Sequence, residues 1–138
     1  MFLLDTNVVS ELRPGKKGRP SAAVRTWAGG VPIEHQFLSV MTLYELDVGT
    51  LAMERRDPAQ GAALRAWFDA LRALFASRTL PVTSEVAARC ARLQVPARLP
   101  EVDALIAATA LTHRMTVVTR NVQDFARTGV QLLNPWGD

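Results

Sequence analysis

Short apolar runs alternate with longer amphipathic stretches along most of this chain. Five runs are too short for a helix and suit buried strands, and they fall at residues 2–4, 37–40, 80–82, 116–119 and 130–133. Six stretches show helical spacing or capping residues, and they fall at residues 8–12, 21–30, 42–55, 58–76, 84–94 and 101–113. Because parallel strands need crossovers, and crossovers are usually helices, this alternation predicts an α/β fold. We expect about five mostly parallel strands with helices on both faces of the sheet.

Two of the predicted helices carry a run of apolar residues at helical spacing. The helix over 42–55 has an apolar arc, formed by Met41, Tyr44, Val48 and Leu51. The helix over 58–76 has an apolar stripe, formed by Leu64, Phe68, Leu71 and Phe75. Most of this stripe is expected in the core, while a part of it near Trp67 is a candidate surface for a second copy or a small protein partner. On the outward face of the same helix, Arg65 and Arg72 are expected to be solvated.

Length and composition favour one self-sufficient domain over residues 1–138. The chain has 138 residues, of which 49% are hydrophobic. This is enough for a full hydrophobic core without stabilisation by disulfide bonds or a structural metal. Cys90 is the single cysteine, so no intrachain disulfide can form, and this favours a reducing cytoplasm. The first residues lack the pattern of a signal peptide, and no run of 18 apolar residues indicates a membrane span.

The charge balance permits a nucleic-acid partner without requiring one. The 16 Lys and Arg residues against 13 Asp and Glu residues give a net charge of +3. The loop over residues 13–19 concentrates four cations in seven residues. It would either grip phosphates, in which case binding would weaken with salt, or form a solvated loop.

Four carboxylates are expected at one edge of the predicted sheet. Asp5 closes the first strand, Glu45 lies on the helix that leaves the second strand, and Asp103 lies in the first turn of the 101–113 helix. Asp124 lies in the loop after the 116–119 strand. Because ligands of open α/β sheets bind beyond the carboxyl ends of the strands, these residues mark a candidate site. A purely structural role is the alternative for these acids, as a helix cap, as a charge that complements the helix dipole, or as a turn residue.

The acids differ in how strongly the local pattern favours a recessed position. The helix after Asp103 is apolar or small on every face, so the Asp103 carboxylate is expected at its interior edge, whereas Asp47 is expected to be solvated. Carboxylates that face one another repel, so a cation would have to lie between them if all are ionised. Oxygen ligands select Mg²⁺ or Mn²⁺, and such a site suits phosphate chemistry. The histidines, His35 and His113, are expected to be structural.

These residues lie in motifs that together resemble the PIN-domain ribonucleases, most closely the toxins of the VapC and FitB type. The similarity covers nearly the whole chain, and its motifs are Phe2-Leu3-Leu4-Asp5-Thr6-Asn7, Thr42-Leu43-Tyr44-Glu45-Leu46 with Gly49, Asp103 to Ala110, Val118-Thr119-Arg120-Asn121 with Asp124-Phe125, and Leu133-Asn134-Pro135-Trp136. The resemblance implies a PIN fold, Mg²⁺- or Mn²⁺-dependent cleavage of RNA, and Asp5, Glu45 and Asp103 as the acidic core. It also implies inhibition by a small antitoxin protein and contact with DNA only through that antitoxin. Members of the family commonly form dimers, so the resemblance implies a homodimer of this chain.

One position departs from the fuller family pattern. Asn121 stands where many PIN nucleases carry a fourth acid, and an asparagine can ligate through its carbonyl oxygen but adds no charge. We therefore predict one metal, held by Asp5 and Asp103, with Glu45 completing the shell or orienting the attacking water. The catalytic set is completed by Asp124, and the rim of the site would consist of Thr6, Thr119, Asn121 and Asp124.

Two other enzyme classes with an acidic pocket on a parallel sheet fit less well. A phosphatase of the haloacid dehalogenase type needs a second acid where this chain has Asn7, and a phospho-receiver domain needs a lysine late in the chain. The lysines here are Lys16 and Lys17 alone. The remaining alternative is a catalytically silent PIN-fold module that binds RNA or protein.

Overall fold

The computed structural model describes residues 1–15, 18 and 20–137. Strands and helices alternate along the described chain in the following order: β1 (Phe2–Leu4), α1 (Thr6–Glu11), α2 (Ala22–Gly30), the 3₁₀ turn η1 (Ile33–His35), β2 (Gln36–Ser39), α3 (Val40–Arg56), α4 (Pro58–Leu74), η2 (Ala76–Arg78), β3 (Thr79–Leu80), α5 (Ser84–Leu93), α6 (Glu101–His113), β4 (Thr116–Val118), α7 (Val122–Phe125), η3 (Ala126–Thr128) and β5 (Leu132–Leu133). The predicted α/β alternation is confirmed.

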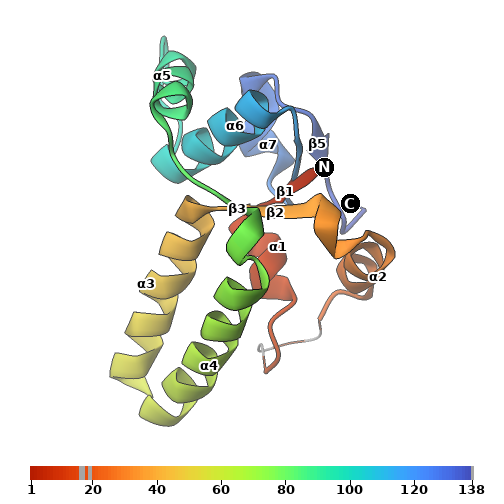
Figure 1. The fold of residues 1–138 in the computed structure, drawn as a ribbon, viewed down its shortest axis with the longest axis vertical. Coiled ribbons are helices and arrows are strands. Elements are labelled where there is room, and N and C mark those ends of the chain that lie inside the picture. The colour runs from red at the N-terminus through yellow and green to blue at the C-terminus, as the bar shows by residue number, and fades with distance from the viewer. Residues whose placement is uncertain (16–17, 19, 138) are drawn as a thin grey trace.

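The five strands form one parallel sheet in the order β3-β2-β1-β4-β5. β1 lies in the centre, where Leu3 pairs with Phe37 of β2 and with Val117 of β4. Figure 1 shows α5, α6 and α7 on one side of this sheet and α1, α2, α3 and α4 on the other. The predicted sheet with helices on both faces is therefore confirmed, and the carboxyl ends of β1, β2 and β4 meet at one edge.

A separate apolar core fills each side of the sheet. On the side of α1 and α4, Leu4, Val8 and Phe68 pack together. On the side of α6 and α7, Leu3 packs with the buried side chains of Ile106 and Phe125. The helix α6 is also covered by α5 through a third cluster, so most of its residues from Ala104 to Ala110 are buried. This confirms the prediction, made from its apolar composition, that the helix is enclosed on most sides.

Local capping signals place several helix ends where the sequence predicts them. Ser21 precedes α2, and its Oγ accepts a hydrogen bond from the Val24 N–H. Asp57 caps α4 through the Gln60 N–H, and Pro58 occupies the first helical position. The bounds of α6 agree with the predicted residues 101–113.

Other boundaries differ from the predicted ones by two residues. The helix α1 begins at Thr6 and not at residue 8, because Asp5 caps it directly through the Thr6 N–H. The last strand covers only Leu132–Leu133, two residues fewer than predicted. The strand β3 ends before Pro81 and pairs only with β2, as expected for a strand limited to an edge by proline.

The apolar arc of α3 is not part of the core. Tyr44, Val48 and Leu51 are 58%, 50% and 56% exposed, whereas Thr42 and Thr50 on the opposite side of the helix are buried. The reason is that α3 and α4 form a hairpin that extends away from the sheet, as Figure 1 shows. Only one side of α3 is then covered, and the buried residues on it are Thr42, Leu46 and Thr50. The exposed residues Tyr44, Val48 and Leu51 are called the α3 apolar face below.

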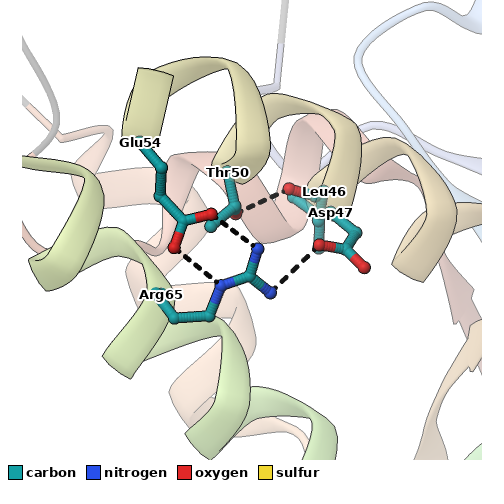
Figure 2. A network of polar contacts seen from close by, with 5 residues as sticks. All are labelled: Leu46, Asp47, Thr50, Glu54 and Arg65. Carbon is teal, nitrogen blue, oxygen red and sulfur yellow. Dashed lines mark hydrogen bonds and ion pairs between the residues drawn. The ribbon is translucent and has the colours of Figure 1, made fainter. Parts of the chain in front are cut away.

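An arginine on α4 joins the two helices of this hairpin, contrary to its expected solvated position. Figure 2 shows Arg65 between Glu54 and Asp47 of α3. Its Nε and one terminal nitrogen donate to the two oxygens of Glu54 at 3.2 and 3.0 Å, and its other terminal nitrogen lies 3.0 Å from Asp47 Oδ1. The hydrogen bond from Arg65 lowers the pKa of Glu54. Asp47, also expected in solvent, is therefore one of the acids that orient Arg65.

None of the helices in the described part of the chain is long and apolar enough to cross a membrane. Three of the seven residues of the basic loop predicted over 13–19 lie outside the described residues, namely Lys16, Lys17 and Arg19, and Arg13 is its described cation. The two histidines are exposed, one in η1 and one at the end of α6. The single cysteine, Cys90, is buried in α5, and this burial raises the pKa of its thiol.

Candidate active site

Asp5 occupies the first position after the central strand β1 and is only 5% exposed. Its Oδ1 accepts a hydrogen bond from the Thr6 N–H at 2.8 Å, and its Oδ2 accepts one from Thr119 Oγ1 at 2.8 Å. Burial raises the pKa of Asp5, and the two hydrogen bonds act in the opposite direction. Asp5 thus caps α1 with Oδ1 and is held at the candidate site through Oδ2. The two explanations considered for this residue are therefore compatible.

Glu45 reaches the same edge from α3, the helix that leaves β2. The Thr6 hydroxyl donates a 2.6 Å hydrogen bond to Glu45 Oε1. Thr42 is fully buried beneath them, and its hydroxyl lies 3.3 Å from that of Thr6. Thr6, which follows Asp5 at the start of α1, therefore holds the Glu45 carboxylate of α3 in place.

Asp103 lies in the first turn of α6, above the enclosed part of that helix. Partial burial, followed by the charges of Asp5, Asp124 and Glu45, raises the pKa of Asp103 to about 6. The N-terminus of α6 has no side-chain cap. The expected position of Asp103 at the interior edge is confirmed by its partial burial and by its electrostatic interaction with the other three acids.

The buried side chain of Thr119, directly after β4, links the elements around the site. Besides donating to Asp5, its Oγ1 accepts hydrogen bonds from Asn7 Nδ2 at 3.2 Å and from the Asn121 N–H at 3.0 Å. The Thr119 N–H in turn donates to the Leu133 carbonyl of β5 at 3.0 Å. One hydroxyl therefore connects β1, α1 and the segment that follows β4.

These groups surround a cavity of about 510 Å³ at the carboxyl ends of the strands. Ten described residues line it: Asp5, Thr6, Asn7, Ser10, Glu11, Glu45, Asp103, Arg120, Asn121 and Trp136. Three of the four predicted acids, together with Thr6 and Asn121, thus come together in one cavity. Asp124 lies outside its lining, exposed in α7 and not in a loop as predicted, but its charge raises the pKa of both Asp5 and Asp103.

In the arrangement described, no three of the His, Cys, Asp and Glu side chains stand close enough together to enclose one metal ion. Oxygens of Asp5 and Glu45 are held instead by the hydroxyls of Thr119 and Thr6. The donors available at the cavity are nevertheless carboxylate, hydroxyl and amide oxygens, which suit a hard divalent cation. Neighbouring negative charges contribute to the raised pKa of both Asp5 and Asp103, and a cation would relieve these charges. The metal role of Asp5, Asp103 and Glu45 stays a prediction.

Five lining residues were not singled out as functional in the sequence, namely Asn7, Ser10, Glu11, Arg120 and Trp136. Ser10 lies about one helical turn after Thr6 in α1, but this spacing does not by itself indicate a function. Glu11 is 6% exposed, and its Oε1 accepts a hydrogen bond from the Ser21 N–H at 2.8 Å, a contact between α1 and the start of α2. No local pattern in the sequence predicts this contact across the loop.

The fold and the site define a member of the PIN domain family. The family model for the PIN domain matches residues 2–131, and the chain belongs to this family. Toxin FitB of Neisseria gonorrhoeae is 35% identical over 144 aligned positions that cover 100% of both chains. VapC ribonuclease Y4jK of Sinorhizobium fredii is 37% identical and covers 99% of this chain and 98% of its own. The crystal structure of FitAcB from Neisseria gonorrhoeae superposes with a TM-score of 0.89, at 34% identity and 100% coverage of both chains.

These similarities confirm the resemblance on which the sequence interpretation rests. The predicted fold is confirmed by the family match and by the superposition over the whole chain. The predicted class, a nuclease related to toxins of toxin–antitoxin pairs, is confirmed by relatives named as a toxin and as a ribonuclease.

Proposed function

We propose that this chain is a metal-dependent endoribonuclease that hydrolyses phosphodiester bonds of RNA, and that it acts in the cytoplasm as the toxin of a toxin–antitoxin pair. The observation that carries the proposal is that Asp5, Glu45 and Asp103 line one cavity. Burial, followed by the charges of Asp5, Asp124 and Glu45, raises the pKa of Asp103 there to about 6. The full-length similarity to FitB and to a VapC ribonuclease supports the same activity. We further propose that residues 1–138 form one domain.

Asp5 and Asp103 are the proposed ligands of a divalent cation, Mg²⁺ or Mn²⁺. Such a cation, when bound, lowers the pKa of water and stabilises the negative charge that develops on the phosphate. Thr119 and Thr6 hold the carboxylates of Asp5 and Glu45 in place before substrate binds. Glu45 would complete the metal shell or orient the attacking water.

The residues at the rim are proposed to adjust this arrangement. Asp124 adds negative charge near Asp5 and Asp103 from outside the cavity lining, and we keep it in the proposed catalytic set. Asn121 lines the cavity, and its side-chain amide would supply a neutral oxygen. Hydrolysis would proceed by in-line displacement at phosphorus.

The proposed protein partners are a small antitoxin and a second copy of the chain. Solved structures of relatives include FitAB bound to a DNA fragment, which is 34% identical to this chain with a TM-score of 0.88. We infer by similarity that an antitoxin covers this chain and that contact with DNA is made through the antitoxin. The exposed α3 apolar face is the surface we propose for contact with the second copy.

Cleavage of labelled RNA by the purified protein tests the proposed activity. We expect cleavage with Mg²⁺ or Mn²⁺, none with EDTA, and loss of at least 100-fold in rate for Asp5→Asn and Asp103→Asn with folding retained. Asp69→Asn on the exposed surface of α4 is the matched control and should cleave like the wild type. Binding of RNA without cleavage under any metal would instead assign the chain to the silent PIN-fold modules. Near wild-type activity of either variant would refute the assignment of that acid.

A further inference from the structure

The cavity that holds the acids also contains one aromatic and one cationic side chain. Among the described lining residues, Trp136 is the aromatic one and Arg120 the cationic one. The guanidinium carbon of Arg120 lies over the Trp136 ring, 5.3 Å from the ring centroid. Trp136 is partly buried, with its other contacts in the core beside β1 and α1, while Arg120 is exposed. The acidic cavity is therefore bordered by a cation and a ring that support each other.

Backbone pairing fixes this pair relative to the acids. Val118 at the end of β4 pairs with Leu133 of β5, and the turn that contains Trp136 follows directly. Asn134 Oδ1 accepts a hydrogen bond from the Trp136 N–H at 2.9 Å, which shapes this turn. On the other side, the Arg120 N–H donates to Asn7 Oδ1 at 3.4 Å. Because the same Asn7 contacts Thr119, the Arg120 backbone and the Asp5 carboxylate belong to one hydrogen-bonded framework.

The three carboxylates of the cavity repel the phosphates of RNA unless a cation lies between them, and the Arg120 guanidinium beside them adds an attractive contact for a substrate. Unpaired bases are commonly held by stacking on aromatic rings or on the planes of arginine guanidinium groups. A base within a duplex has both of its faces covered by neighbouring base pairs and cannot use such a surface. The chemistry of the pair therefore selects single-stranded RNA.

We propose that Arg120 and Trp136 form a stacking platform for an unpaired RNA base next to the phosphate that is cleaved. In this arrangement the base stacks on the Arg120 guanidinium, and Trp136 supports the guanidinium from behind. The positive charge of Arg120 also attracts the adjacent phosphate. The inference rests on the proposed ribonuclease function and adds two binding residues to it.

Binding of a labelled, mixed-sequence single-stranded RNA, measured by fluorescence anisotropy, tests the platform. The measurement uses the Asp103→Asn protein, so that the RNA stays intact. Arg120→Lys keeps the charge and removes the planar group, and we expect it to raise the Kd about tenfold. Trp136→Leu should have a similar effect, whereas Trp136→Phe, which keeps an aromatic ring, should bind nearly as the parent does.

Inorganic polyphosphate serves as a probe that carries phosphates without bases. We expect Arg120→Lys and Trp136→Leu to leave its Kd within about twofold of the parent, because only base stacking is lost. Arg92→Lys on the exposed surface of α5 is the matched control and should leave both Kd values unchanged. Melting temperatures establish that each variant is folded.

One result would overturn the platform. If Arg120→Lys binds RNA as tightly as the parent protein, no base stacks on the guanidinium. A weakening by Trp136→Leu alone would then show that Trp136 acts through packing of the fold.

Cleavage kinetics with single-stranded RNA separate this inference from the proposed function. For Arg120→Lys in the otherwise wild-type protein we expect a raised KM with a smaller change in kcat. RNA cleavage by the wild type with no effect of Arg120→Lys on KM would refute the platform alone. Failure of the wild type to cleave any RNA, together with Arg120-dependent binding, would refute the ribonuclease activity and keep the platform.

Discussion

The hydroxyl of Thr119 donates a 2.8 Å hydrogen bond to Oδ2 of Asp5, a residue 114 positions earlier in the chain. Both residues are the first to follow adjacent parallel strands, β1 and β4. Thr119 is fully buried, and Asp5 is nearly so. The bond therefore fixes one oxygen of the central carboxylate from the neighbouring strand, while the start of α1 fixes the other oxygen.

Removal of this hydroxyl should impair the site more than the fold. Thr119→Val keeps the shape of the side chain but leaves Asp5 Oδ2 without its donor, and we expect a loss of about 1–3 kcal/mol in the free energy of unfolding. The pKa of Asp5 should rise further, because the hydrogen bond opposes the effect of burial. Metal-dependent RNA cleavage should fall by at least about tenfold at pH 7. Steady-state cleavage assays and urea denaturation measure the two effects.

Thr119→Ser is the control for this prediction. Serine retains the hydroxyl and should keep most of the activity, at a cost of about 1 kcal/mol for the lost methyl group. If Thr119→Val cleaves RNA as fast as Thr119→Ser, the hydrogen bond to Asp5 has no role in the activity.

The raised pKa of Asp103 predicts that the metal-free protein becomes less stable as the pH rises. The folded-state pKa is about 6, above the ordinary value of 3.8, so the folded state binds more protons than the unfolded state between these two pH values. The contribution of Asp103 to the free energy of unfolding should consequently be most favourable below about pH 4, and it should be lost as the pH rises through about 6. With a discount for solvent screening, the loss attributable to Asp103 is roughly 1–2 kcal/mol at pH 7.5.

Asp103→Asn tests this dependence in EDTA. At pH 7.5 we expect the variant to be more stable than the wild type by this amount in urea denaturation, although it loses cleavage activity. Near pH 4 the advantage should disappear, because Asp103 of the wild type is then protonated. Asp69→Asn, at an exposed position, should show no such dependence. Equal stability of Asp103→Asn and wild type at both pH values would contradict the electrostatic account.

The sequence was sufficient for those parts of the fold that depend on local patterns. The β-branched strand β4 at Thr116–Val118, the cap at Ser21 and the bounds of α6 follow from propensity and capping, which act over a few residues. The candidate acids were also found in this way, because strand ends can be recognised in a parallel α/β pattern. Each of these predictions needed only neighbours along the chain.

The remaining features depend on how the elements pack. Helical periodicity indicated the apolar arc of α3 but could not show whether a second layer covers it, and the hairpin with α4 leaves Tyr44 and its neighbours exposed. Similarly, Arg65 was expected in solvent because its partners lie on another helix. Trp136 enters the site only through the pairing of β5 with β4, which no local signal specifies.

The α3 apolar face should hold two copies of the chain together. We expect the wild-type protein to have the mass of a dimer in light scattering coupled to size exclusion. Val48→Glu places a charge in the centre of this face and should give a folded monomer, because Val48 is 50% exposed in one chain. Its melting temperature should fall only by the stabilisation that the dimer contact supplies. Ala87→Glu at an exposed position of α5 should remain a dimer. A dimer that persists in Val48→Glu would show that the copies meet elsewhere.

Close packing of α3 against α4 predicts opposite effects for two glycine substitutions. In the interior of a helix, alanine normally stabilises by about 1 kcal/mol relative to glycine. At Gly61 of α4, however, a Cβ atom would lie 2.4 Å from the Cα of Glu54 and 2.7 Å from its backbone nitrogen. Because backbone atoms cannot turn aside, the two helices would have to separate, and Gly61→Ala should destabilise the protein by roughly 1–3 kcal/mol.

Gly49 of α3 is the matched position, since a Cβ atom there meets nothing within 4 Å. Gly49→Ala should therefore stabilise the protein by about 0.5–1 kcal/mol. Urea denaturation of both variants measures the difference, with equal m-values as the sign that only the folded state has changed. If Gly61→Ala were stabilising as well, α3 and α4 could not approach as closely as described. The Arg65 contacts with Glu54 and Asp47 would then have to span a wider gap, because they depend on the same approach.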